Sequence, residues 1–301
     1  MSRFTTIHTL LLCAKEKLDK VGIDGGWRDA RLLLASVLDV RPDYLVAHSE
    51  AGVPLHKIEH FYQYLERRLN REPVSRILWT REFWSLPFKI SPATLDPRPD
   101  SETLIEAVLK DYPDRYVPLK ILDLGTGSGC LLLTLLKEYP EAYGIGIDIS
   151  LDALLTAREN AVNLQVCDRV NFVQSSWGKG LKGSFDVLVS NPPYIPAFEI
   201  NNLDPEVKLY EPLNALDGGE SGLDCYHMLA WQFSLLSHRG SRLYLEIGQG
   251  QENAVEKIMK EAGYVCSLWH RDLAGIKRCG VFSQTKTCDD PYQKSERCQS
   301  E

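Results

Sequence analysis

The chain has 301 residues, of which 44% are hydrophobic, so it is long enough to bury one large domain or a large domain with a smaller partner. Its formal net charge of -7 disfavours a protein whose main task is to grip nucleic acid, because such proteins neutralise many phosphates. No apolar run approaches the roughly 20 residues that span a bilayer, and the first residues do not form an export signal, so we expect a soluble cytoplasmic protein.

The eight cysteines are scattered along the chain. None forms a Cys-x-x-Cys pair, and no histidines lie nearby at zinc-ligand spacing. We therefore predict reduced thiols that mostly serve packing, and no metal site.

In residues 1–75 apolar side chains recur at intervals of three and four, as in Leu33 and Val37, which is the period of an amphipathic helix. Pro42 and Pro54 interrupt this pattern, because proline is poorly tolerated inside a helix. The pattern predicts a small bundle of short helices at residues 1–75.

Residues 76–100 have a different character and are predicted to form a structured linker. Four prolines exclude a helix there, and residues 81–84 and 88–90 suggest a short hairpin. Ser101 then resembles the cap of a helix, because its hydroxyl can accept a hydrogen bond from an early backbone N–H. The apolar stripe at residues 104–109 fits that helix.

The main domain is predicted at residues 101–285, and residues 286–301 are expected to be a polar, mobile tail. From residue 120, strand and helix patterns alternate, which predicts a parallel sheet covered by helices. The strands are expected at 121–124, 144–148, 170–173, 185–189 and 242–247, with a closing hairpin at 264–269 and 278–282.

Three glycines stand where the first of these strands turns into a helix, in the run Gly125-Thr126-Gly127-Ser128-Gly129. Glycine allows the backbone to approach a ligand closely at such a turn. The spacing differs from the Gly-x-Gly-x-x-Gly pattern that seats the pyrophosphate of a dinucleotide. The loop therefore indicates a nucleotide-like ligand but does not have the spacing of a dinucleotide-binding loop.

Asp148 ends the next strand, about 20 residues beyond the glycine loop. A carboxylate at that position can accept hydrogen bonds from both hydroxyls of a ribose. The loop and the acid together favour a cofactor that contains adenosine. The alternative is that Asp148 only caps the helix that begins near Ser150.

Asn191-Pro192-Pro193-Tyr194 follows a buried strand at the carboxyl end of the predicted sheet, where ligands bind in open α/β folds. The two prolines fix φ and remove two N–H donors, so the carbonyls and the Asn191 amide are expected to point rigidly outward. The alternative is a plain proline turn that closes the strand.

This loop suits the chemistry of a poorly nucleophilic nitrogen, whose lone pair is delocalised in an amide or an aryl amine. If the Asn191 side-chain oxygen and the Pro192 carbonyl each accept one N–H, the lone pair can be aimed at a sulfonium methyl. Tyr194 offers a flat face for a planar amide or base. Asn191, Pro192 and Tyr194 are therefore the predicted catalytic residues.

At these motifs the chain closely resembles the HemK/PrmC family, protein-glutamine methyltransferases that modify the Gly-Gly-Gln tip of class I peptide-chain release factors. The likeness covers nearly the whole chain and includes residues 81–84, 97–102, 125–129, 191–194, 211–212, 215–216, 218–219 and 271–275. It implies a class I, Rossmann-like α/β methyltransferase domain with a seven-stranded sheet, preceded by a small N-terminal helical bundle that serves substrate recognition.

The resemblance also implies site residues and a partner. S-adenosyl-L-methionine would be held by Gly125, Thr126, Gly127, Ser128, Gly129 and Asp148, with Asn191 at the cofactor and Trp177 flanking the adenine. Residues Asn191, Pro192, Pro193 and Tyr194 would clamp the glutamine amide of a release factor. On sequence alone, Trp177 is equally compatible with a place in the core.

Two features depart from the family pattern: Asp96, where an apolar residue is expected, and the cysteine-bearing tail. Two interpretations of Arg98 and Glu102 stay open, contact with the methionine end of the cofactor or a structural lock on the linker.

Two other functions compete with glutamine methylation. One is an adenine-amine methyltransferase acting on DNA or RNA, which would need a basic groove. Residues 91–301 instead hold 20 Lys and Arg against 30 Asp and Glu. The other is a non-catalytic adaptor, which the intact glycine loop, Asp148 and Asn-Pro-Pro-Tyr motif argue against.

Overall fold

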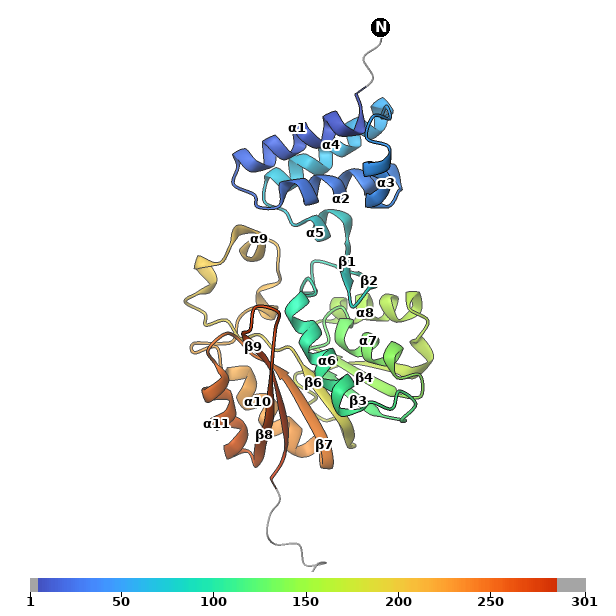
Figure 1. Ribbon diagram of the computed structural model, residues 1–301. Coiled ribbons are helices and arrows are strands. Elements are labelled where there is room, and N and C mark those ends of the chain that lie inside the picture. The colour runs from blue at the N-terminus through green and yellow to red at the C-terminus, as the bar shows by residue number, and fades with distance from the viewer. Residues whose placement is uncertain (1–4, 286–301) are drawn as a thin grey trace, which may run out of the picture. The chain divides into compact units, whose positions relative to one another are not determined.

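A computed structural model of the chain describes residues 5–285 (Figure 1). The predicted tail at residues 286–301 lies outside this range. The chain forms two compact units. The first comprises residues 5–97 together with Phe198–Leu216, and the second comprises Arg98–Ala197 and residues 217–285.

The first unit contains the helical bundle predicted from apolar periodicity. Its helices are α1 (Ile7–Lys20), α2 (Gly26–Leu38), α3 (Pro42–Ala47), α4 (Leu55–Leu69) and α5 (Val74–Leu78). The two prolines begin helices rather than interrupt them, Pro42 as the first residue of α3 and Pro54 as the N-cap of α4, because an early helical position needs no N–H donor. Buried leucines such as Leu10, Leu33 and Leu65 form the centre of the bundle.

The predicted hairpin is also present in the first unit. Strands β1 (Thr80–Phe83) and β2 (Leu86–Lys89) pair in antiparallel fashion. The rings of Phe83 and Phe88 are buried and meet edge to face, with their centroids 6.2 Å apart.

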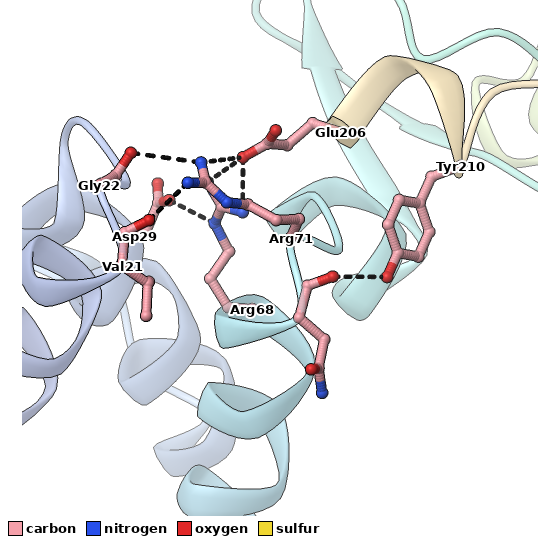
Figure 2. A network of polar contacts seen from close by, with 8 residues as sticks. Val21, Gly22, Asp29, Arg68, Arg71, Glu206 and Tyr210 are labelled. Atoms are coloured by element: carbon pink, nitrogen blue, oxygen red, sulfur yellow. Dashed lines mark hydrogen bonds and ion pairs between the residues drawn. The ribbon is translucent and has the colours of Figure 1, made fainter. Parts of the chain in front are cut away.

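Phe198–Leu216 groups with the helical bundle, a placement that the sequence did not suggest. This segment holds the short helix α9 (Pro205–Lys208), and Figure 2 shows how Glu206 of α9 joins the bundle. Glu206 Oε1 accepts hydrogen bonds from Arg68 Nη1 at 3.2 Å and Arg71 Nη1 at 3.3 Å. The Arg68 Nε donates to Asp29 Oδ2 at 2.8 Å, so an almost buried guanidinium pairs with two carboxylates.

A second polar cluster in this unit lies deeper. The Arg76 Nη2 donates to Glu211 Oε2 at 2.6 Å, and their side chains are only 3% and 1% exposed. Glu211 also accepts the backbone N–H of Asp96 at 3.1 Å, and Asp96 Oδ2 accepts from the Ser75 hydroxyl at 2.6 Å. Asp96, the acid found where an apolar residue was expected, thus belongs to a hydrogen-bonded buried cluster.

The second unit is built on a seven-stranded sheet with the order β5-β4-β3-β6-β7-β9-β8. Its strands are β3 (Lys120–Leu124), β4 (Tyr143–Asp148), β5 (Val170–Gln174), β6 (Phe185–Ser190), β7 (Ser237–Glu246), β8 (Tyr264–Arg271) and β9 (Lys277–Gln284). Strands β3 to β7 are parallel, whereas β9 runs antiparallel to both β7 and β8. The predicted parallel sheet and closing hairpin are confirmed.

Helices cover both faces of this sheet (Figure 1). Helices α6 (Glu102–Asp111), α7 (Cys130–Glu138) and α8 (Leu151–Asn163) pack in succession, while α10 (Asp224–Leu236) packs with α11 (Glu252–Glu261). Because β4, β3, β6 and β7 are parallel neighbours, the loops after them meet at one edge of the sheet. Within residues 5–285, no helix has the length and apolar character needed to cross a membrane.

Candidate active site

The glycine loop after β3 has a backbone that only glycine adopts readily. Gly125, Gly127 and Gly129 have φ values of 81°, 55° and 82°, in the left-handed region. A Cβ at Gly127 would meet no atom within 4 Å, so there is open space beside the loop backbone. At Gly129 a Cβ would lie 2.9 Å from Leu133 Cδ1, so this glycine serves close packing instead.

Asp148 at the end of β4 ties this loop to the neighbouring strand. Its Oδ2 accepts the Gly127 N–H at 2.9 Å, and its Oδ1 accepts the Ser150 N–H at 2.9 Å. The cap of α8 is Ser150 itself, whose hydroxyl accepts from the Ala153 N–H. Each carboxylate oxygen can accept more than one hydrogen bond, so Asp148 retains capacity for ribose hydroxyls.

Below the loop lies a fully buried acid, Asp123. Its Oδ2 accepts from the Thr126 hydroxyl at 2.7 Å, whereas its Oδ1 has no partner among the described residues. Burial raises the pKa of Asp123 to about 7. A buried carboxylate oxygen without a partner, close in sequence to the glycine loop, fits a ligand that brings hydrogen-bond donors.

Trp177 lies beside the glycine loop. Its backbone has a φ of 53°, and its Cζ3 lies 3.9 Å from the position of a Cβ at Gly125. The ring also packs against the core on one side. Both sequence interpretations of Trp177 are thus compatible with its place.

The Asn-Pro-Pro-Tyr loop follows β6, which is next to β3 and its glycine loop. The Ser190 hydroxyl, at the end of β6, donates to the carbonyl of Leu124, at the end of β3, at 2.6 Å. The Asn191 Nδ2 donates to the Ser101 hydroxyl at 2.9 Å. Within residues 5–285 the Asn191 Oδ1 accepts no hydrogen bond, so this oxygen is available to a substrate N–H.

Tyr194 closes the loop and is held at both ends. Its carbonyl accepts from Gln251 Nε2 at 2.9 Å, and its hydroxyl lies 3.5 Å from Glu246 Oε1. Burial raises the pKa of Tyr194 well above its ordinary value, so the phenol stays neutral.

Ser101 does not act as predicted. It precedes α6, but its side chain makes no capping hydrogen bond, because its backbone is already helical (φ -68°, ψ -16°) whereas a capping side chain requires an extended backbone. Its hydroxyl instead donates to Glu246 Oε2 at 2.5 Å. The prediction of a side-chain cap at Ser101 is therefore wrong.

Glu246, the last residue of β7, was missed by the sequence reasoning. It is 1% exposed, and burial raises its pKa to about 7, with opposing contributions from Ser101 and Arg278. An acid at the carboxyl end of a buried parallel strand was the available signal, the same signal that identified Asp148.

A glycine-rich turn supports the Tyr194 backbone. Ile195 forms a parallel bridge with Asp217, and the Gly218 N–H donates to the Ile195 carbonyl at 2.9 Å. A Cβ at Gly218 would lie 2.8 Å from Tyr194 Cα and 2.9 Å from Gly222 Cα, both backbone atoms that cannot swing aside.

Gly218→Ala is accordingly expected to push the Tyr194 backbone out of place and to destabilise the protein by about 1–3 kcal/mol. Turnover should fall at least roughly tenfold, because a displacement near 1 Å disrupts alignment of reacting groups. Thermal melting and single-turnover rates measure the two effects. Gly240→Ala is the control, because its Cβ meets only the His238 side chain; equal rates in both variants would contradict the role of Gly218.

The sheet order, the glycine loop and the acid that ends β4 define a class I, Rossmann-like S-adenosylmethionine-dependent methyltransferase domain. The family model for a methyltransferase domain matches residues 118–285, and the family model for the PrmC N-terminal domain matches residues 9–78. The hMettl16 catalytic domain, solved in complex with the MAT2A 3'UTR hairpin 6, has the same fold at 12% identity, with a TM-score of 0.54 over 85% of this chain and 94% of that one.

Sequence comparison identifies the family. The release factor glutamine methyltransferase of Bradyrhizobium diazoefficiens is 45% identical over 83% of this chain and 85% of its own length. That of Agrobacterium fabrum is 39% identical over 92% of this chain and 97% of its own length. The chain belongs to the release factor glutamine methyltransferase family, as the resemblance predicted.

Proposed function

We propose that this protein transfers a methyl group from S-adenosyl-L-methionine to the side-chain amide nitrogen of the glutamine in the Gly-Gly-Gln motif of class I peptide-chain release factors, in the cytoplasm. The relatives that support this proposal carry the name of that activity. The observation that carries it is the orientation of Asn191, whose amide N–H is engaged by Ser101 while its oxygen remains available.

The proposed chemistry assigns one task to each part of the site. The Asn191 oxygen and the Pro192 carbonyl accept the two N–H groups of the glutamine amide, which aims the nitrogen lone pair. Tyr194, kept neutral, provides a flat surface for the amide plane. S-adenosyl-L-methionine supplies an activated methyl on a sulfonium. The new nitrogen–methyl bond forms as the sulfur–methyl bond breaks, so S-adenosyl-L-homocysteine leaves and the nitrogen gives up one proton to solvent. This direct displacement needs no metal ion and no covalent enzyme intermediate.

Residues that fit this cofactor come from the ends of β3 and β4 and from the loop after β5. The backbone at Gly127 lies beside open space, Asp148 retains acceptors for the ribose hydroxyls, and Trp177 lies beside Gly125, where it can flank the adenine. Asp123 Oδ1, near the end of β3, offers a further hydrogen-bond acceptor.

Adenine-amine methylation is less supported. A nucleic-acid substrate would need a basic surface for its phosphates, and residues 91–301 carry an excess of acidic residues.

The direct test is peptide mass spectrometry of a purified class I release factor incubated with the protein and S-adenosyl-L-methionine. We expect one added methyl group, located on the glutamine of the Gly-Gly-Gln motif, and none on a factor in which that glutamine is replaced by asparagine. Parallel reactions with single-stranded and duplex oligonucleotides test the alternative. A methyl group found only on nucleic acid would refute the proposal.

A further inference from the structure

Asn191 is a carboxamide, whose oxygen and nitrogen ends are nearly the same in shape but opposite in hydrogen bonding. The proposed function requires the oxygen end to face the substrate. If the group rotated by half a turn, it would present N–H donors to the glutamine N–H groups, and the interaction would become repulsive. Neighbouring groups must therefore stabilise one of the two orientations of this carboxamide.

We propose that Ser101 and Glu246 are positioning residues that set the orientation of the Asn191 carboxamide, and this inference rests on the proposed function. Asn191 Nδ2 lies 2.9 Å from Ser101 Oγ, and Ser101 Oγ lies 2.5 Å from Glu246 Oε2. The three side chains come from the loop after β6, the start of α6 and the end of β7.

The direction of this chain of hydrogen bonds follows from the inventory of donors. An ionised carboxylate only accepts hydrogen bonds, so the single proton of the Ser101 hydroxyl is committed to Glu246. The hydroxyl can then only accept from its other neighbour. Asn191 must turn its NH2 group toward Ser101, and its oxygen faces the opposite way.

Glu246 also approaches the other end of the motif, through the Tyr194 hydroxyl at 3.5 Å. One buried carboxylate thereby holds both the acceptor and the stacking surface of the proposed amide clamp. Protonation of Glu246 would remove this control, because a protonated carboxyl can donate to the Ser101 oxygen and free the hydroxyl proton for Asn191 Oδ1.

Six titratable groups face Glu246. They are Asp100, Cys130, Tyr194, Tyr226, Arg278 and Cys279. Burial raises the pKa of Cys130 to about 12 and the pKa values of Tyr194, Tyr226 and Cys279 well above their ordinary range. The pKa of Glu246 is raised to about 7, so the fraction in the ionised, orienting form falls as pH drops below that value.

The test measures kcat and KM for release-factor methylation, and cofactor affinity by calorimetry, in Ser101→Ala, Glu246→Gln and the wild type between pH 5.5 and 8.5, a range of about 1.5 units on either side of neutrality. Ser101→Ala should lower kcat roughly 10- to 100-fold, since the amide loses its orientation, with cofactor affinity within about twofold. Wild-type kcat should fall about tenfold per pH unit below about 7, and Glu246→Gln should lose this dependence.

Ser241→Ala is the matched control. Ser241 is another buried serine, on the same strand as Glu246, and its hydroxyl donates to the Phe185 carbonyl far from Asn191. It should retain wild-type kcat and pH dependence. A wild-type kcat in Ser101→Ala, an equal loss in Ser241→Ala, or an acid limb that persists in Glu246→Gln, which would point to Asp123, would overturn the proposal. Absence of methylation by the wild type would instead refute the proposed function.

Discussion

Asn191→Ala is expected to lower the turnover of release-factor methylation about 100- to 1,000-fold, the cost of removing one preorganised group that acts on the reacting centre. The truncation removes the oxygen that would accept a glutamine N–H, while the glycine loop and Asp148 remain intact. Cofactor affinity should therefore change little. Single-turnover rates and calorimetric titration with S-adenosyl-L-methionine separate the two effects.

A second substitution at the same position sharpens this expectation. Asn191→Asp keeps an oxygen toward the substrate but loses the N–H that Ser101 accepts, and it places a negative charge beside Glu246. It should also be strongly impaired, which simple loss of an acceptor does not predict. Asn163→Ala, in the last turn of α8 and away from the site, is the control. A wild-type rate in Asn191→Ala would exclude this residue from the chemistry.

The sheet and its ligand loops could be predicted because their signals are local. Gly125 to Gly129 follow one short apolar strand and Asp148 ends the next, and the parallel arrangement brings such strand ends together. The Asn-Pro-Pro-Tyr motif was visible for the same reason, since it follows the strand that pairs with β3.

The supporting residues could not be predicted in this way, because they depend on contacts between distant parts of the chain. Ser101 and Glu246 are 145 positions apart, and nothing near Ser101 distinguishes a capping serine from one that faces a buried acid. The choice was made by the backbone of Ser101, which is helical and so unsuited to capping. Position 218 likewise requires glycine because the Tyr194 backbone lies against it, and sequence alone does not show that contact.

The assignment of Phe198–Leu216 to the helical unit was also beyond local reasoning. The segment contains short helical turns and exposed apolar side chains such as Phe198 and Leu209, which suggest no particular packing partner. Its placement depends on charge pairs with the bundle, of Glu206 with Arg68 and of Glu211 with Arg76. The Glu211-Pro212 motif of the resemblance thus has a structural reason in the first unit.

Arg76→Ala is expected to destabilise the first unit by about 3–5 kcal/mol, because it leaves a buried carboxylate without its cation. Arg76 donates to the Ser91 and Thr94 carbonyls as well as to Glu211, and these acceptors would also lose a donor in a site that water reaches poorly. Hydrogen exchange followed by mass spectrometry measures the effect locally. Peptides from α5 and from Phe198–Leu216 should exchange faster. The affinity of the protein for the cofactor should not change, because the glycine loop lies in the second unit.

Two further variants distinguish a buried pair from an ordinary surface contact. Arg41→Ala removes a pair with Asp43 whose side chains are 85% and 64% exposed, and it should leave the stability nearly unchanged because solvent screens this pair. The double variant Arg76→Met with Glu211→Gln removes both buried charges, and it should be more stable than Arg76→Ala because no carboxylate is stranded. If the double variant were the less stable of the two, the cost would lie in lost packing and carbonyl contacts rather than in the unpaired charge.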